Sequence, residues 1–242
     1  MEWKCISLCG DREANEDCIK VVESYGLKCF IVADGLGGHG KGDVASALAC
    51  DAFESIFTNS APDIPLTDFV SSAFLKAQTD ILFEQKKSGS LYQMKTTVCT
   101  LAARGDEVVW GHIGDTRLYA FAHNKVKIRT LDHSVPQMLA LAKDIKEKDI
   151  RNHPDRNKLL RVLGNSGETP KFEISEPQYI QKFQAFLLCS DGFWELIVEK
   201  EMGSLLKKSG SAGEWMDKMC DVVKQRGSTT EMDNSSAIAI WV

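Results

Sequence analysis

Five aspartates of this sequence lie where an apolar, strand-like run begins or ends. The clearest is Asp34, which follows the apolar residues 30–33 and precedes a segment with four glycines in six residues. A run of that length is typical of a buried strand, so we expect this carboxylate at the rim of a core, where an unpaired charge is costly. One such acid is typical of a turn, but the repetition favours a shared site. The five residues are Asp17, Asp34, Asp115, Asp191 and Asp233.

Clustered carboxylates repel one another and take up protons unless cations lie among them. The pattern offers oxygen ligands and no cysteine or histidine spacing for a metal, so we expect hard ions such as Mg²⁺ or Mn²⁺. Two such ions about 3.5–4 Å apart would lower the pKa of a bridging water toward ~7 and clamp a phosphoryl oxygen. The planar guanidinium of Arg12 matches two phosphate oxygens, which makes it a candidate phosphate ligand; the alternative is an exposed loop arginine.

The glycine-rich segment 35–40 could also be a phosphate-binding loop of a nucleotide site. Its spacing fits neither the GxGxxG pattern nor the GxxxxGK[ST] pattern, and it therefore does not favour a dinucleotide site. The glycines do allow the amides and carbonyls after Asp34 to approach a ligand closely.

The composition excludes several classes of partner. The 242 residues are 43% hydrophobic and 26% charged, with a net charge of −5 and no stripe of lysine and arginine, so nucleic acid is not expected as a partner. The first residues lack a signal-peptide pattern, and no apolar run approaches the length of a membrane span. The eight cysteines contain no CxxC pair, and we interpret them as reduced thiols of a cytoplasmic protein.

The hydrophobic periodicity predicts an α+β fold. Strands are expected at residues 3–9, 18–23 and 28–33, and two amphipathic helices follow between residues 44 and 87. Short connections predict that the next four strands form one antiparallel meander. Those strands are residues 96–103, 107–113, 117–122 and 126–131. The later elements are strands at 171–175, 185–190 and 235–242, with amphipathic segments near 193–208 and 213–225.

Eight short motifs follow one another along the chain. They are Arg12-x-x-Asn15-Glu16-Asp17, ADGLGGH at 33–39, Thr96-Thr97, IGDTRLY at 113–119, LDHS at 131–134, LRVLG at 160–164, SDGFWE at 190–195 and Asp233-Asn234-Ser235. Together they resemble the metal-dependent serine/threonine protein phosphatases of type 2C, in particular the bacterial branch of that family. Each motif alone is common, but all eight in the family's order are specific.

The resemblance implies an α-β-β-α sandwich, in which two antiparallel sheets are flanked by helix pairs. It implies a single catalytic domain over residues 1–242, with a metal centre in a cleft at one end of the sheets. Residues 134–160 correspond to the family's variable flap, which influences substrate preference more than chemistry.

The resemblance also implies a role for each site residue. Asp34 would bridge two Mn²⁺ or Mg²⁺ ions, and the Gly35 carbonyl would bind the first of them. The second ion would be completed by Asp17, Asp191 and Asp233. A metal-bound hydroxide would then attack the phosphorus of phosphoserine or phosphothreonine.

Three more residues receive roles from the same resemblance. Asp115, together with Asp191, would offer a weaker third metal site. Glu16 would lie next to the ions and hold metal-bound waters. Arg12 would receive the phosphate.

The sequence departs from the family at several positions. Leu36 stands where many eukaryotic relatives have a histidine proposed as the general acid, and His39 is at best a substitute for it; the alternative for His39 is a loop histidine bonded to backbone. Lys95 replaces a glycine before Thr96. His112 and His133 are interpreted as structural rather than metal-binding.

The predicted function is the dephosphorylation of phosphoserine and phosphothreonine in proteins, as a signalling enzyme that opposes a serine/threonine kinase. A monomer is expected, with neither membrane nor nucleic acid as partner. The alternatives are a catalytically weak or inactive sensor or binding module with the same fold, and a phosphohydrolase of small molecules. Because all the acidic positions are filled, the sequence favours the active enzyme.

Overall fold

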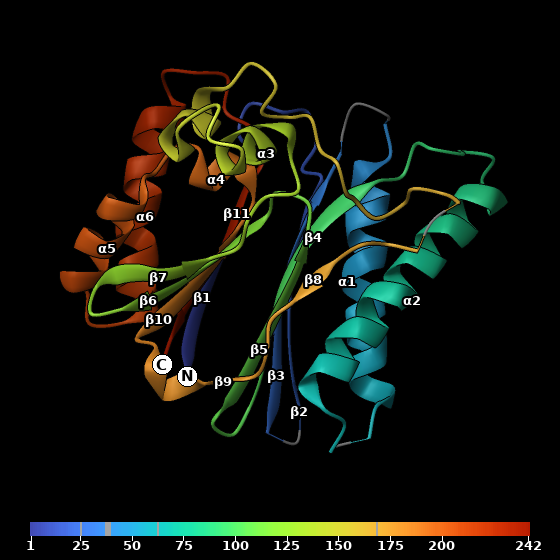
Figure 1. Ribbon diagram of the computed structural model, residues 1–242, viewed down its shortest axis with the longest axis horizontal. Helices are drawn as coiled ribbons and strands as arrows, with labels where there is room; N and C mark the ends of the chain where they lie inside the picture. The colour runs from blue at the N-terminus through green and yellow to red at the C-terminus, as the bar shows by residue number, and fades with distance from the viewer. Residues whose placement is uncertain (25, 37–39, 62, 168) are drawn as a thin grey trace.

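The computed structural model describes residues 1–24, 26–36, 40–61, 63–167 and 169–242. Within these ranges two β-sheets lie face to face, and a pair of helices covers the outer face of each sheet (Figure 1). The predicted α-β-β-α sandwich of antiparallel sheets is therefore confirmed.

Sheet 1 has the strand order β1-β11-β10-β6-β7, and its paired strands are antiparallel. Its strands are β1 (Glu2–Leu8), β6 (Arg117–Ala122), β7 (Lys125–Arg129), β10 (Ala185–Cys189) and β11 (Ser235–Trp241). Because β1 pairs with β11, the first and last strands of the described chain are neighbours.

Sheet 2 has the strand order β2-β3-β4-β5-β8, and the short strand β9 also pairs with β5. Its strands are β2 (Asp17–Ser24), β3 (Leu27–Gly35), β4 (Thr96–Arg104), β5 (Glu107–Ile113), β8 (Glu173–Ile174) and β9 (Gln178–Tyr179). Neighbouring strands are antiparallel here as well.

Four of the described helices pack on the outer faces of the sheets, and two shorter helices lie at the end of the sandwich opposite the chain termini (Figure 1). Helices α1 (Gly42–Asn59) and α2 (Leu66–Lys87) pack on sheet 2, and α5 (Glu199–Lys207) and α6 (Ala212–Gly227) pack on sheet 1. At the end of the sandwich lie α3 (Val135–Leu141) and α4 (Asp191–Trp194). The 3₁₀ turns are η2 (Glu147–Asn152) and η3 (Ile180–Lys182).

Alternation along the strands builds a hydrophobic core between each pair of layers. In β3, Cys29 and Ile31 pack toward α1 and α2, whereas Phe30 and Val32 pack between the two sheets. Successive side chains of a strand point to opposite faces, so a strand that is buried on both sides reads as one apolar run. The same alternation in β10 brings Leu187 into the core beneath α5 and α6.

The prediction of a four-strand meander is wrong. β4 and β5 pair in sheet 2, but β6 and β7 pair in sheet 1, so the chain crosses between the sheets at residues 114–116. Gly114 has a φ of +97°, and a Cβ at this position would lie 2.4 Å from Thr97 Cγ2. The crossing therefore requires glycine. A short connection predicts a hairpin, but a left-handed glycine can equally redirect the chain into the other sheet.

Two further observations concern cysteine usage and membranes. All eight cysteines, each within the described ranges, are free thiols, as expected.

Among the described helices, none is both long enough and apolar enough to cross a lipid bilayer.

The close packing of α2 on sheet 2 gives a test of the fold. A Cβ at Gly111 would lie 2.8 Å from Val70 Cγ1 and 2.9 Å from Phe74 Cε2, so Gly111→Ala should lower the free energy of unfolding by about 1–3 kcal/mol through overpacking. Gly213 in α6 meets nothing closer than 3.9 Å, and Gly213→Ala should raise it by about 0.5–1 kcal/mol. Denaturant unfolding measures both. Equal effects of the two substitutions would contradict this packing.

Candidate active site

The pairing of β2 with β3 brings the first two predicted site acids together. Asp17 lies directly opposite Asp34 in the antiparallel register, and Thr97 of β4 is the next residue across. Directly opposed residues share a face of the sheet, with Cβ atoms about 4.5–5.5 Å apart. The Asp34 carbonyl accepts a hydrogen bond from Thr96 Oγ1 at 2.8 Å, which fixes the backbone at the end of β3.

A third acid, Asp191, is the first residue of α4 and lies two residues after the end of β10. Its carboxylate is close enough to that of Asp34 to raise the pKa of Asp34. The preceding Ser190 donates to Asp17 Oδ2 at 2.9 Å, so sheet 1 is tied to sheet 2 at this point. A Cβ on Gly192 would lie 2.2 Å from the Asn234 carbonyl oxygen, which explains a glycine after this aspartate.

Asp115 is buried at the crossing between the sheets. Its carbonyl accepts a hydrogen bond from Trp194 Nε1 at 3.0 Å, which links the crossing to α4. The Arg117 guanidinium lies 3.4 Å from the centre of the Trp194 ring. Arg117 also forms a two-pronged ion pair with Asp132, at 2.8 Å and 2.6 Å, and both side chains are 2% exposed. This buried pair holds Trp194 and, through it, the segment that carries Asp115.

The acids repel one another electrostatically. Burial raises the pKa of Asp34 well above its ordinary value, and the carboxylates of Asp191 and Asp17 raise it further. Burial likewise raises the pKa of Asp115 and that of Asp191, each with a smaller contribution from a neighbouring acid. The pKa of Asp17 is raised to about 7, mainly by burial. Desolvated carboxylates at this density are stable when protonated or bound to cations.

One atom of this group lacks any partner. Asp17 Oδ1 is buried and accepts no hydrogen bond from the described residues. An unsatisfied buried carboxylate oxygen is rare, because its desolvation is not compensated. The donor set around it consists of carboxylate oxygens, the ligands that Mg²⁺ and Mn²⁺ prefer. The chemistry of these donors therefore fits divalent cations, while in the described part of the chain no three of the acids bring oxygens within 4.8 Å of one another.

A loop beside the acids is held by backbone contacts. The Glu16 carbonyl accepts hydrogen bonds from the Gly35 amide at 3.1 Å and from Ser46 Oγ at 2.6 Å. A Cβ on Gly35 would lie 2.3 Å from the Gly42 carbonyl oxygen, so the start of α1 packs directly on the end of β3. Burial raises the pKa of Glu16.

Asn234 fixes the same loop from the other sheet. Its Nδ2 donates to the carbonyls of Cys9 at 2.7 Å and Ala14 at 3.0 Å, and its Oδ1 accepts from the Glu16 amide at 2.8 Å. Asn234 and Ser190 were noted in motifs, but no role was predicted for either. Both are small polar residues next to acids, and that position is the signal that could have identified them.

Arg12 and Asp233 bind each other. Arg12 Nε donates to Asp233 Oδ1 at 2.8 Å, and Nη2 donates to Oδ2 at 2.7 Å. Both side chains are about half exposed, at 54% and 43%. Arg12, the predicted phosphate ligand, is thus next to Asp233, a predicted metal ligand. A phosphate bound by Arg12 would therefore lie close to a metal ion bound by Asp233.

A cleft opens beside these residues, with a volume of about 550 Å³. Its wall includes Arg12, Asp191 and Asp233 from the predicted site, and Arg151 and Arg156 from the segment 134–160. Asp191 and Asp233 therefore have access to solvent through a cleft that residues from the segment 134–160 help to form.

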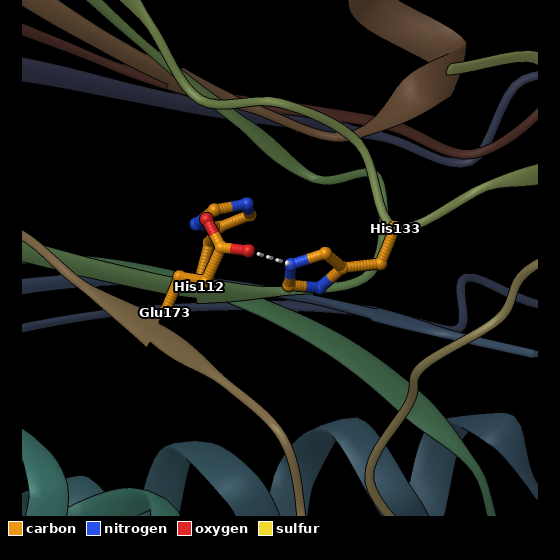
Figure 2. A group of neighbouring side chains, drawn as sticks. All are labelled: His112, His133 and Glu173. Carbon is orange, nitrogen blue, oxygen red and sulfur yellow. Dashed lines mark ion pairs between the residues drawn. The ribbon is translucent and has the colours of Figure 1, made fainter. Parts of the chain in front are cut away.

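His112, His133 and Glu173 form a second cluster of neighbouring side chains (Figure 2). Among the described residues, this is the trio of His, Cys, Asp or Glu whose potential ligand atoms all lie within 4.8 Å of one another. The two rings are stacked, however, with centroids 4.6 Å apart and planes 16° apart. Lone pairs lie in the ring planes, so stacked rings do not direct them at one ion.

Hydrogen bonds explain the histidine cluster without a metal. His133 Nδ1 accepts from the Gly114 amide at 3.2 Å, and the His133 amide donates to the Gly114 carbonyl at 2.9 Å. His112 Nε2 bonds the Leu131 carbonyl at 2.8 Å. Burial lowers the pKa of His133 to about 4 and also lowers that of His112. These neutral histidines hold the turn before Asp115, which agrees with their interpretation as structural.

The departures from the family pattern have different outcomes. Lys95 is accommodated, since its carbonyl accepts a hydrogen bond from the Leu36 amide at 3.0 Å. Gly164, at a φ of +93°, packs against Met94, where a Cβ would lie 2.0 Å from the carbonyl oxygen. His39 lies outside the described residues, as do Gly37 and Gly38 of the same motif.

Comparison with known proteins identifies the family. The sequence profile described as protein phosphatase 2C matches residues 9–235, and the chain therefore belongs to the protein phosphatase 2C family. The chain is 31% identical over 210 residues to a protein named serine/threonine phosphatase stp from Listeria welshimeri, covering 85% of this chain and 82% of that one. It is 28% identical to serine/threonine protein phosphatase PstP of Mycobacterium tuberculosis over 75% of this chain and 34% of that protein.

Solved structures agree on the fold. Serine/threonine phosphatase Stp1 from Staphylococcus aureus superimposes with a TM-score of 0.89 at 22% identity, over 100% of this chain and 94% of that one. The catalytic domain of PstP, crystallised with two manganese ions, gives a TM-score of 0.79 at 22% identity, over 99% and 97%.

The raised pKa of Asp17 predicts how stability depends on pH. Its pKa is about 7 in the folded chain and about 3.9 in an unfolded one, so between these values the folded state holds a proton that the unfolded state releases. The free energy of unfolding of the chelator-treated protein should therefore decrease as pH rises from about 4 to about 7. Asp17→Asn should remove this pH-dependent loss of stability. The free energy of unfolding of the variant, relative to that of the wild type, should therefore increase from about pH 4 to pH 7. Denaturant unfolding at several pH values measures this difference. Parallel plots of the free energy of unfolding against pH for the two proteins would contradict the prediction.

Proposed function

We propose that this protein is a metal-dependent phosphatase that hydrolyses phosphoserine and phosphothreonine in proteins. The observation that carries the proposal is the group of desolvated carboxylates around the unpartnered oxygen of Asp17, next to a cleft that Asp191, Asp233 and Arg12 line. Membership of the protein phosphatase 2C family supports it, as do relatives named serine/threonine phosphatases.

Divalent cations would be held by the acids at the ends of the strands. Asp17, Asp34, Asp191 and Asp233, with the Gly35 carbonyl, are the ligands that we propose for two Mn²⁺ or Mg²⁺ ions. Asp115, with Asp191, is proposed for a third, and Glu16 for holding water beside them. When bound, such ions lower the pKa of coordinated water toward about 7 and polarise a phosphoryl oxygen.

The protein itself supplies binding and orientation. Arg12 can present two N–H groups to a phosphoryl group in the way that it now presents them to Asp233. The hydrogen bonds from Ser190 and Asn234 keep the acids and the loop 9–16 in fixed positions, so the reacting groups need little reorganisation.

The substrate class and cellular setting are also part of the proposal. A cleft of about 550 Å³ that opens beside the acids admits a phosphorylated side chain and neighbouring residues. We propose a phosphoprotein substrate made by a serine/threonine kinase, and a monomeric protein of the cytoplasm. We further propose that residues 1–242 form one catalytic domain, with a flap at about 134–160.

Phosphate release tests the proposed activity. With Mn²⁺, the protein should release phosphate from a phosphothreonine peptide and from an aryl phosphate, and EDTA should abolish both reactions. Asp34→Asn should lower kcat/KM by at least ~100-fold, because it removes the proposed bridging ligand. The control is Asp51→Asn, an exposed aspartate of α1 that pairs with Lys20, and it should retain activity.

Other outcomes separate the alternatives. Mn²⁺ binding by calorimetry without turnover of any phosphopeptide would favour the inactive sensor or binding module. Sugar phosphates or nucleotides that outcompete phosphopeptides would favour a phosphohydrolase of small molecules. Activity that survives both EDTA and Asp34→Asn would reject the proposed mechanism.

The ion pair of Arg12 with Asp233 gives a second test. Arg12→Gln should raise KM for a phosphopeptide about tenfold, since it removes a two-pronged contact to phosphate. It should also tighten Mn²⁺ binding, because Asp233 loses a competing cation. Calorimetry measures the second effect independently of turnover. Arg226→Gln is the matched control, since Arg226 forms a similar exposed pair with Glu201 and neither residue lines the cleft. Unchanged KM and unchanged Mn²⁺ affinity would contradict both roles.

A further inference from the structure

The flap segment places a buried cation in the wall of the cleft. Arg151 lies on η2, and its side chain is 12% exposed. Its Nη2 donates to Glu199 Oε1 at 2.7 Å, but Nη1 is buried and has no hydrogen-bond partner in the described part of the chain. A charged donor that is desolvated and unpaired costs free energy, so a ligand that supplies an acceptor recovers that cost.

The charge of Arg151 is only partly compensated. Glu199 also accepts a hydrogen bond from the Tyr119 hydroxyl at 3.2 Å and lies 3.9 Å from Arg117, so one carboxylate serves several groups. The Arg151 guanidinium lies 5.3 Å from the centre of the Trp194 ring. The aromatic ring orients the guanidinium without supplying an acceptor for Nη1.

The other arginines of the cleft wall, Arg12 and Arg156, are both paired with acids. Arg12 pairs with Asp233 through two hydrogen bonds, and Arg156 donates to Glu195 at 3.0 Å. Arg151 therefore stands out among the arginines of this wall as the one with a buried, unpartnered nitrogen.

Arg151 is also close to the proposed reaction site. One cavity of about 550 Å³ is lined both by Asp191 and Asp233 and by Arg151 and Asn152. A peptide whose phosphoryl group lies at Arg12 and the acids therefore continues along the wall that contains Arg151.

We infer that Arg151 binds an anionic group of the substrate near the phosphorylated residue, and that it is a specificity-determining residue. The group is the carboxylate of an aspartate or glutamate, or a second phosphoryl group; both offer paired oxygens to the guanidinium. This inference rests on the proposed function and adds the substrate class that the same cleft selects.

Phosphopeptides of matched sequence test the inference. A phosphothreonine peptide is prepared with alanine, aspartate or phosphoserine at each of about three positions on either side. The wild type should have a higher kcat/KM for at least one peptide with an acidic or phosphorylated neighbour. Arg151→Gln should remove that preference, with a loss of about tenfold, and should leave the alanine peptide and an aryl phosphate unchanged. The aspartate and phosphoserine arms distinguish the two sources of the anion.

Matched variants separate binding of the anion from support of the flap. Lys148→Gln removes an exposed positive charge from the same 3₁₀ turn and should retain the preference. Arg151→Lys keeps the charge but not the planar fork, and should retain part of it. Glu199→Gln removes the competing carboxylate and should strengthen the preference. Fluorescence anisotropy with the same peptides measures binding without turnover.

The results distinguish a failure of the inference about Arg151 from a failure of the proposed phosphatase function. An equal loss of kcat/KM for every peptide and for the aryl phosphate would show that Arg151 only holds the flap, and would overturn the inference. A wild type with turnover but no preference for anionic neighbours would also overturn it. If no substrate is turned over with Mn²⁺, the proposed function fails, and the anisotropy data still decide whether Arg151 selects anionic peptides.

Discussion

Carboxylates buried near one another repel, and this repulsion is the constraint on which the structure at the α3–α4 end of the sandwich depends. Asp17 and Asp34 come from strands of sheet 2, and Asp191 begins α4 just after β10 of sheet 1. Their separation is set by the pairing of β2 with β3 and by the bond from Ser190 to Asp17. The hydrophobic cores on both sides of the sheets supply the favourable free energy that keeps these acids in place. Local destabilisation at a site, offset by packing elsewhere, is a common property of functional centres.

Much of the fold, and the acids that the structure places near one another at the ends of the strands, could be predicted from the sequence. Strands buried on both faces read as apolar runs, and β3 and β10 show that pattern clearly, so the aspartates that follow them could be placed at strand ends. The helical periodicity of α1 and α2 predicted their apolar faces. The order of the motifs then indicated that distant acids belong to one site.

What could not be predicted depends on contacts between residues far apart in the chain. The turn at Gly114 has the length of a hairpin connection, and only its left-handed backbone and its packing on Thr97 send β6 into the other sheet. The ion pair of Arg12 with Asp233 joins residues 221 positions apart. The exposure and hydrogen bonding of Arg151 depend on Glu199 and Trp194, which no local pattern relates to it. In the mixed-charge segment around it, the arginines look alike in sequence.

The antiparallel pairing of β1 with β11 has a consequence for how the chain can be extended or rearranged. Glu2 lies opposite Trp241, so the two ends of the polypeptide leave the sheet together, at the end of the sandwich away from α3 and α4 (Figure 1). Additional sequence attached at either end would project away from the cleft. A short covalent link between residues 1 and 242 would therefore close the backbone without crossing the cleft.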